Sequence, residues 1–111
     1  MNRNVLLLVC LAFVGCTLAE DAAPDSLASV WCGKKRRCDR ADFENTWDNR
    51  AECEDDIAAA IETTQDFYDL LGCEWDGRGA AKIRADIRGK SCSEFAEAEF
   101  EGSAELYDCG G

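Results

Sequence analysis

Cysteine is the residue type in this sequence whose chemistry is most informative. Eight of the 111 residues are cysteines, and the chain has no histidine. Six of the cysteines lie in the body of the chain, and they are Cys32, Cys38, Cys53, Cys73, Cys92 and Cys109. Structural zinc sites and redox-active pairs use cysteines separated by about two to four residues, whereas the shortest spacing here is five. An even number of widely spaced cysteines instead predicts disulfide bonds, and therefore an oxidising compartment.

Other residue patterns that support catalysis are absent from the sequence. Without histidine the chain has no Ser-His-Asp triad, no Cys-His pair and no HExxH zinc site. It also contains no glycine-rich nucleotide-binding motif and no GxSxG motif. The acidic run Glu54-Asp55-Asp56 lacks the alternating ligands and the glycine of a calcium-binding loop. We therefore expect no catalytic residues, no metal and no cofactor, although the composition leaves a carboxylate hydrolase open.

The charged residues are unevenly distributed along the chain. There are 23 acidic and 12 basic residues, a formal net charge of −11, which argues against nucleic acid and anionic lipid as partners. Beyond Arg3, the basic residues form two groups, at 34–40 and 78–90, with Arg50 between them. A basic patch could contact phospholipid head groups or an acidic partner. We favour the interpretation that two basic helices flank an acidic one and reduce its self-repulsion, at about 0.2 to 1 kcal/mol for each exposed ion pair.

The first nineteen residues have the pattern of a secretory signal peptide. Arg3 precedes an uncharged apolar stretch, Val5 to Gly15, which is shorter than the roughly 20 residues that a membrane-spanning helix needs. Two cleavage sites are compatible with this pattern. Cleavage before Cys16, which we favour, follows a lipobox-like sequence and leaves Cys16 as a lipidated N-terminus. Cleavage after Ala19 would release an unmodified chain.

Residues 17–25 are predicted to be a flexible tether, and residues 26–111 a cysteine-rich helical domain. The longest predicted helix runs from Arg50 to Leu71. Asp48 or Asn49 is suited to cap its start, and Gly72 to end it. Its apolar stripe recurs every three or four positions, as on one face of a helix, and consists of Cys53, Ile57, Ile61, Thr64, Tyr68 and Leu71, widened by Ala60 and Phe67.

Shorter helices are predicted on both sides of this one, at about 26–37 and 79–88. A fourth begins near Cys92, where Ser91 and Glu94 form a capping-box pattern, and turns Phe95 and Phe100 inward. Residues 103–111 add at most one further turn. No segment alternates apolar and polar residues for long enough to predict a strand. The predicted fold is therefore all-α, a small disulfide-stabilised bundle of three to four short helices.

Helix geometry suggests an order for the cysteine pairs, although the sequence alone leaves many pairings open. A hairpin of the first two helices would bring Cys38 close to Cys53. An antiparallel third helix would return Cys92 to the same end, where Cys32 remains as its partner. The last segment would then carry the sixth cysteine back, which gives the third predicted pair, Cys73 with Cys109. Closing a loop of about 15 residues stabilises a fold by roughly 3 kcal/mol.

Several motifs together resemble small cysteine-rich exported proteins that are common in myxobacteria and their relatives, often as lipoproteins. The resemblance covers about residues 27 to 95. It is carried by Cys32-x5-Cys38 with Phe43 after it, Ala51-Glu52-Cys53, Cys73-x-Trp75-Asp76, an Ala-Ala helix and Ser91-Cys92-Ser93-Glu94-Phe95. Such proteins often carry another cysteine in the Ala-Ala helix, where this chain has Lys82, Ile83 and Ile87. The resemblance implies export and a helical fold, and no biochemical activity.

These features together predict a non-catalytic, exported and lipid-anchored domain that acts at the cell envelope by contact with another macromolecule. Its only expected membrane association is through the N-terminal lipid. The alternative is a secreted toxin or effector peptide that is processed at the basic run Lys34 to Arg37. That run also fits a dibasic cleavage site, although it falls within a predicted helix.

The sequence predicts that this small domain depends on its disulfides for stability. We expect the purified protein to unfold at a lower temperature after reduction, because the thin core loses the constraint on the unfolded chain. Thermal unfolding followed by circular dichroism, with and without reductant, measures the difference. Equal melting temperatures would contradict the predicted role of the cysteines.

Overall fold

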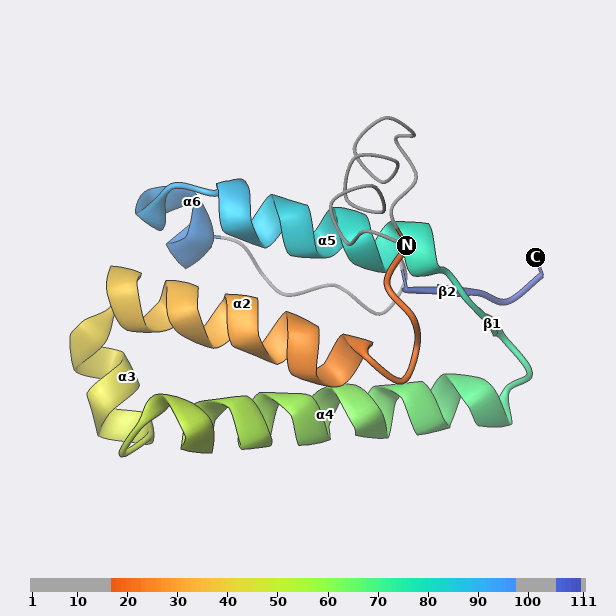
Figure 1. The fold of residues 1–111 in the computed structure, drawn as a ribbon, viewed down its shortest axis with the longest axis horizontal. Coiled ribbons are helices and arrows are strands. Elements are labelled where there is room, and N and C mark those ends of the chain that lie inside the picture. Colours follow the sequence, from red (N-terminus) through yellow and green to blue (C-terminus); the bar gives the residue numbers. More distant parts are fainter. Residues whose placement is uncertain (1–16, 98–105, 111) are drawn as a thin grey trace, which may run out of the picture.

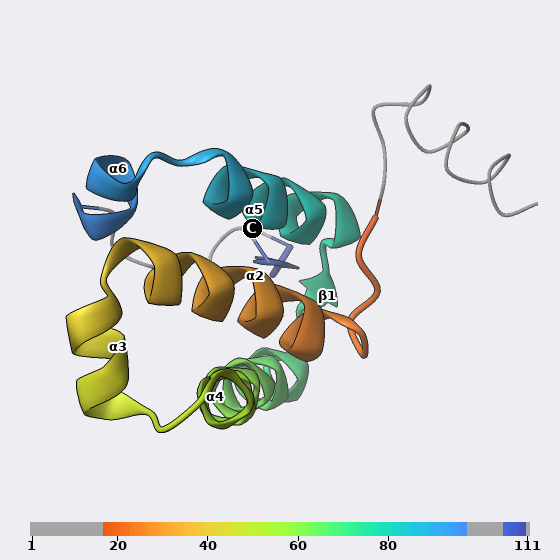
Figure 2. The same ribbon diagram turned by 60° about the vertical axis from the view of Figure 1, so that its left-hand side comes forward.

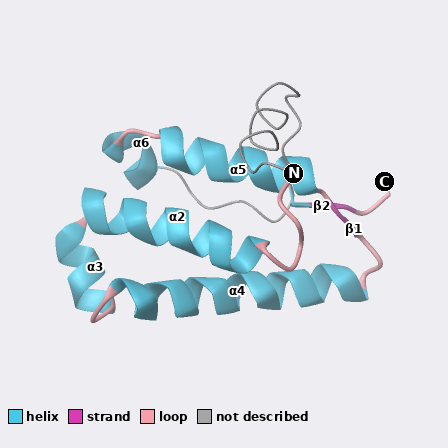
Figure 3. Cartoon of the chain, in the orientation of Figure 1, coloured by secondary structure: helices cyan, strands magenta, loops and turns pink. Residues whose placement is uncertain are grey.

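A computed structural model describes residues 17–97 and 106–110 of this chain. Over those residues it contains five helices and two very short strands, which confirms the predicted all-α, disulfide-stabilised fold (Figure 3). In chain order the elements are α2 (Ala23–Cys38), α3 (Arg40–Thr46), α4 (Arg50–Leu70), β1 (Glu74–Trp75), α5 (Gly77–Gly89), α6 (Cys92–Glu97) and β2 (Tyr107–Asp108).

Helix α2 is the centre of the molecule. It lies between α4 on one side and α5 on the other, and both views in Figure 1 and Figure 2 show this arrangement. Helices α3 and α6 close the end of the bundle where α2 finishes, and the two strands lie toward the other end. Helix α2, which contacts both α4 and α5, also carries most of the first basic group of the sequence.

The helix ends follow the capping signals of the sequence. The Asn49 side-chain oxygen accepts a hydrogen bond from the Glu52 N–H at 2.9 Å, which confirms one of the two predicted caps of α4. The predicted capping box at α6 is confirmed by two reciprocal bonds between Ser91 and Glu94, at 3.2 and 3.0 Å. The bond from the Ser91 N–H lowers the pKa of Glu94, because it favours the carboxylate form. Gly72 follows α4 with a φ of 76°, a conformation suited to glycine.

Helix α2 begins about one turn earlier than the sequence predicted, at Ala23. Pro24 lies in its first turn, where proline needs no hydrogen bond from its nitrogen. The residues before it are also held: Leu18 is only 5% exposed, and its N–H donates to the Gly77 carbonyl at 2.9 Å. The prediction of a flexible tether at 17–25 was therefore wrong, because this segment contributes an apolar side chain to the core.

Helix α3 is the element that the sequence did not predict. Its segment was expected to be only a connection between the first two long helices. Asp39 caps its start, and Phe43 is its one buried residue, at 2% exposed. The centroids of the Phe43 and Trp47 rings lie 5.3 Å apart, so this short helix places aromatic side chains at the end of the bundle that it closes. The pattern was missed because seven residues with one buried side chain show no periodicity.

The core consists of two clusters of buried side chains that meet at Trp31 and Ile57. The smaller cluster, at the α3 end, comprises Cys32, Phe43, Trp47 and Cys53. The larger one joins α2, α4, α5 and both ends of the described chain, and comprises Leu18, Ala23, Leu27, Ile61, Ala80, Ile83, Ile87, Leu106 and Tyr107. A fully buried Leu27 at the centre of this cluster fits the predicted inner face of the first helix.

The far end of α4 departs from its predicted apolar stripe. Phe67 and Leu71 are more than half exposed, and Leu70 is 88% exposed. Gln65 is buried instead, and its amide donates to the Glu20 carbonyl at 2.7 Å. The segment that precedes α2 therefore packs on this part of α4, and it covers the side of the helix that carries Gln65.

The two strands pair in antiparallel fashion, although no strand was predicted from the sequence. Glu74 lies opposite Asp108, and Trp75 opposite Tyr107. Strands of two residues carry no alternation that a sequence pattern can detect. The predicted inward position of Phe100 lies outside the described residues. None of the described helices is long and apolar enough to cross a membrane.

Replacing Leu27 tests the assignment of the larger cluster. We expect Leu27→Ala to lower the free energy of unfolding by about 2 to 5 kcal/mol, because it leaves a cavity at a fully buried position. The matched control is Leu70→Ala, which removes the same atoms from an exposed position and should change stability by about 0.5 kcal/mol or less. Urea denaturation measures both. Equal losses in the two variants would show that this core is placed wrongly.

Candidate functional site

Each of the six cysteines in the body of the chain forms a disulfide. The bonds join Cys32 to Cys53, Cys38 to Cys92 and Cys73 to Cys109, with Cα–Cα distances of 6.1, 5.1 and 4.2 Å. The predicted pair of Cys73 with Cys109 is confirmed. The predicted pairs of Cys38 with Cys53 and of Cys32 with Cys92 were wrong. The same four cysteines pair the other way, Cys32 with Cys53 and Cys38 with Cys92.

The unpredicted helix α3 explains this exchange. A simple hairpin would place the last turn of α2 beside the first turn of α4. Helix α3 instead fills the space at that end, so α4 starts alongside α2, and Cys53 lies opposite Cys32. Cys38 is six residues further along, about 9 Å at 1.5 Å per residue. It is therefore beyond reach of Cys53 and pairs with Cys92 at the start of α6.

A basic hollow lies beside the first of these disulfides, bordered by α2, the start of α4 and the end of α5. Its volume is about 440 Å³. The hollow is lined by Ser26, Ser29, Val30, Gly33, Lys34, Arg37, Arg50 and Arg88. Four of these side chains are cationic, and none of the lining residues is acidic. We refer to this set below as the basic hollow.

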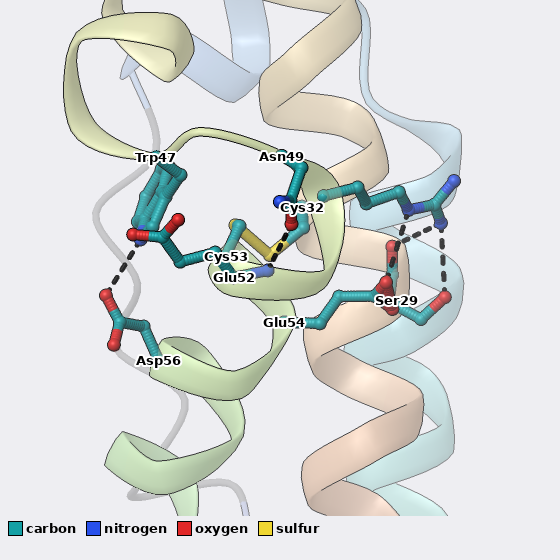
Figure 4. Close-up of a disulfide and its surroundings, with 9 residues drawn as sticks. Ser29, Cys32, Trp47, Asn49, Glu52, Cys53, Glu54 and Asp56 are labelled. Atoms are coloured by element: carbon teal, nitrogen blue, oxygen red, sulfur yellow. Dashed lines mark hydrogen bonds and ion pairs between the residues drawn. A yellow bond between two sulfur atoms is a disulfide. The ribbon is translucent and has the colours of Figure 1, made fainter.

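Small residues on α2 open the space. Ser26, Ser29 and Gly33 recur at intervals of three and four, so they share one face of the helix. A Cβ on Gly33 would lie 3.1 Å from a terminal nitrogen of Arg50, which shows how closely that guanidinium approaches the backbone. Figure 4 shows Ser29 one turn before Cys32, on the side of α2 that faces Glu54 of α4.

The cations at the hollow bond mainly to neutral groups. The Lys34 ammonium donates to the Arg88 carbonyl at 3.0 Å, and Lys34 is only 6% exposed. Arg50 donates to both the carbonyl and the hydroxyl of Ser29, at 3.0 and 3.2 Å, and its Nε lies 3.6 Å from Glu54. Glu54 is therefore the one carboxylate among these contacts, and Glu94 of α6 also interacts with the charge of Lys34.

Arg84 of α5 extends the basic group at one edge. It donates to the Ser26 hydroxyl at 2.9 Å. This contact joins α5 to α2 through a neutral acceptor. The bond from Lys34 to the Arg88 carbonyl does the same nearer the C-terminal end of both helices. The two basic groups of the sequence therefore face each other across the hollow.

This arrangement corrects our interpretation of the two basic groups. The structure does not place them on either side of the acidic helix, because α2 lies between α4 and α5. Within the described ranges the ion pairs lie inside α3, inside α4, or between Lys35 and the carboxylates of Asp39 and Asp42. Asp42 contributes most to raising the pKa of Lys35. None of these pairs involves α5.

A second hollow, of about 250 Å³, is apolar. It lies between α2 and α4, and it is lined by Leu27, Trp31, Ile57, Ala60, Ile61, Thr64 and Leu106. The single hydroxyl of Thr64 is its only side-chain group able to form a strong hydrogen bond, apart from the Trp31 N–H. It offers space for an apolar group and no acid–base chemistry.

An acidic cluster that the sequence did not reveal lies near the far end of α4. The Tyr107 hydroxyl donates a hydrogen bond to the Glu20 carboxylate, and its ring stacks on Tyr68 with centroids 4.9 Å apart. Desolvation, followed by the hydrogen bond and charge of Glu20, raises the pKa of Asp69. Glu20 was assigned to the tether, so no pattern connected these residues. Asp69 lies against Glu20, and Glu20 is already bonded to Tyr107, which differs from an acid pair that flanks a substrate.

Two further expectations concern metal and lipid. Among the residues that the structure describes, no group of three or more cysteine, aspartate or glutamate side chains could hold a metal ion. Cys16, the predicted site of lipidation, and most of the predicted signal peptide lie outside the described residues.

The Tyr107 contact predicts how stability depends on alkaline pH. Desolvation and Glu20 raise the pKa of Tyr107 far above its ordinary value. The unfolded chain ionises this phenol at about pH 10 while the folded chain keeps it protonated, so the stability that the contact supplies is lost as pH rises further. At neutral pH, Tyr107→Phe should cost about 1 kcal/mol, the value of one hydrogen bond.

Denaturation of both proteins between about pH 8 and pH 11 measures this effect. We expect the advantage of Tyr107 over phenylalanine to shrink across that range. A constant difference in the free energy of unfolding would mean that the hydroxyl is not held as described.

No protein-family model matches this chain, and neither a curated protein nor a solved structure matches it. A function for the chain must therefore be inferred from its own side chains, their contacts and their charges.

Proposed function

We propose that this chain is an exported, non-catalytic domain that acts by binding a partner at the cell envelope, and that a lipid on Cys16 anchors it to a membrane. The observation that carries the proposal is the set of three disulfides. Disulfides persist in oxidising compartments outside the cytoplasm and are rare inside it. A leader-like N-terminus and the resemblance to exported lipoproteins support the same location.

The packing of Leu18 supports cleavage before Cys16 rather than after Ala19. Leu18 is buried, its N–H bonds to Gly77, and its carbonyl accepts a bond from the Trp75 indole at 2.7 Å. Cleavage after Ala19 would remove this residue from the core and leave the Trp75 N–H without its acceptor. Cleavage before Cys16 keeps all three contacts.

The same packing sets how close the anchor would hold the domain. Cys16 is two residues from the buried Leu18, and two extended residues span about 7 Å. A lipid on Cys16 would therefore keep the domain next to the membrane surface, with almost no linker.

A binding role agrees better with the side chains than catalysis does. The chain has no histidine, and in the described residues the carboxyl group of raised pKa, Asp69, lies against Glu20, which already accepts a hydrogen bond from Tyr107. The basic hollow, by contrast, presents several hydrogen-bond donors, and its lining includes no carboxylate or histidine that could act as a general base for its serine hydroxyls or for Lys34. Such a lining favours recognition of a charged group.

The alternative of a processed toxin has less support. The basic run Lys34 to Arg37 lies within α2, and Lys34 is almost fully buried. A protease needs an extended substrate, so α2 would have to unfold locally before cleavage. The disulfides at Cys32 and Cys38 hold that segment on both sides.

Mass spectrometry of the mature protein tests the proposed export and anchor. When the chain is produced in a bacterium with its own leader, we expect an N-terminal, lipid-bearing Cys16, no free thiol among the six body cysteines and an uncut Lys34–Arg37 run. Cys16→Ala should abolish lipidation, whereas Cys10→Ala, in the same leader, should leave it intact. An uncleaved leader or reduced cysteines would contradict export. An unlipidated N-terminus at Glu20 would contradict the anchor, and a cut at the basic run would favour the toxin.

A further inference from the structure

The basic hollow is unusual in a chain of this charge. The protein carries a net charge of −11, yet four cations line one hollow and Arg84 lies at its edge. Like charges at close range repel, and burial strengthens the repulsion because the surroundings screen it less. Helices α2, α4 and α5 all contribute, so folding itself brings these charges together. An arrangement of this kind is stabilised by an anion in the hollow.

From this geometry we infer that the basic hollow binds the phosphate group of a small phosphomonoester or of a phospholipid head group. This inference rests on the proposed binding function and names the chemistry of its ligand. Phosphate is favoured over a single carboxylate because its several oxygens can accept bonds from several donors at once.

Lys34 provides the buried charge at the hollow. An ammonium group has three donors, and the only hydrogen bond of Lys34 within the described residues goes to the Arg88 carbonyl. The side chain is 94% buried, so bulk water has little access to its remaining donors. An anion in the hollow would satisfy them and would add to the compensation that Glu94 of α6 already gives to this charge.

Arg37 and Arg88 provide guanidinium groups at the exposed rim. In the described part of the chain, neither side chain forms an ion pair or a hydrogen bond through its guanidinium. They come from the ends of α2 and α5, on two elements of the hollow. Planar guanidinium groups bind phosphate oxygens through paired N–H donors, which suits them for this ligand.

The serine hydroxyls that line the hollow can also donate to an anion. The Ser26 oxygen accepts from Arg84, and the Ser29 oxygen accepts from Arg50. A hydroxyl that accepts one bond still has its own proton to donate. These arginines therefore leave the serine protons available to a phosphate oxygen.

The size of the hollow limits the ligand. About 440 Å³ exceeds a single phosphate ion and lies within the range of small-molecule sites. The lining is polar on most sides, with Val30 as its one apolar side chain. A phosphate that carries a small polar group, such as glycerol 3-phosphate or a lipid head group, fits these dimensions and this lining.

Binding to the oxidised mature chain, prepared without the proposed lipid so that no anchor can insert into vesicles, tests the inference. Isothermal titration calorimetry with inorganic phosphate and glycerol 3-phosphate probes the soluble source, and co-sedimentation with phosphatidic acid vesicles probes the lipid source. Neutral phosphatidylcholine vesicles are the control for the membrane itself. We expect saturable binding to glycerol 3-phosphate or to phosphatidic acid, weakened as salt increases.

Matched charge variants separate this site from general attraction. Arg37→Gln and Arg88→Gln change exposed rim residues and should weaken binding about 10-fold or more, the effect of losing one charged hydrogen bond. Arg36→Gln and Lys82→Gln remove the same charge from α2 and α5 outside the hollow, and should change affinity less than about twofold. Circular dichroism confirms that each variant is folded.

Each outcome has a defined meaning. Vesicle binding alone, lost in Arg37→Gln, assigns the lipid head group, and binding of glycerol 3-phosphate assigns a soluble ligand. No saturable binding to either source, or equal losses in Arg36→Gln and Arg37→Gln, would overturn the inference. Neither result would alter the mass of the exported chain, so the proposed export and anchor stand or fall separately.

Discussion

Disulfide Cys32–Cys53 joins the middle of α2 to the first turn of α4, and its two half-cystines are fully buried in the same cluster as Phe43. The bond is therefore both a covalent link and part of a core that has few large side chains. The other two bonds extend this constraint. Each of the three disulfides closes a loop, and the loops overlap, so that together they cover the chain from residue 32 to residue 109. Helix α5 has no cysteine, yet the segments on both of its sides are bonded. Loops of these lengths stabilise a fold by roughly 3 to 4 kcal/mol each in entropic terms.

The same bond determines where the basic side chains lie. Gly33 follows Cys32 directly, and Arg50 lies one turn before Cys53, so fixing the two sulfurs also fixes the guanidinium of Arg50 above the α2 backbone. Figure 4 shows the disulfide and Ser29 within one close view. Helix α5 completes the hollow through the bond from Lys34 to the Arg88 carbonyl. Charges that repel in solution are held together here because covalent bonds and burial hold the helices that carry them.

The sequence predicted what depends on local periodicity and capping, and missed what depends on register. The long helix, its cap at Asn49 and its end at Gly72 were foreseen because each signal lies within a few residues. Helix α3 and the packing of Leu18 were not, since a short helix and a single buried leucine leave no repeating pattern. The cysteine pairing then failed for two of the three bonds, because a displacement of about 9 Å along α2 decides which cysteine faces Cys53. The two basic groups were recognised in the sequence. That they face each other depends on the packing of α2 against α5, which no local pattern in the sequence indicates.

The net charge of the whole chain argues against a partner only when that partner is large enough to interact with most of the charged residues at once. A nucleic acid presents many charges over a wide surface, and so it would experience the repulsion of the 23 acidic residues. A small anion inside the basic hollow experiences chiefly what lies within the screening length, which is about 8 Å at physiological salt. Among the described residues, cations outnumber carboxylates there, because four cations line the hollow, whereas Glu54 pairs with Arg50 and Glu94 of α6 interacts with the Lys34 charge. Acidic residues elsewhere then have a second effect, because they disfavour polyanions that would compete for the same donors. A small basic hollow in an otherwise acidic chain thus selects for the size of the anion as well as for its charge.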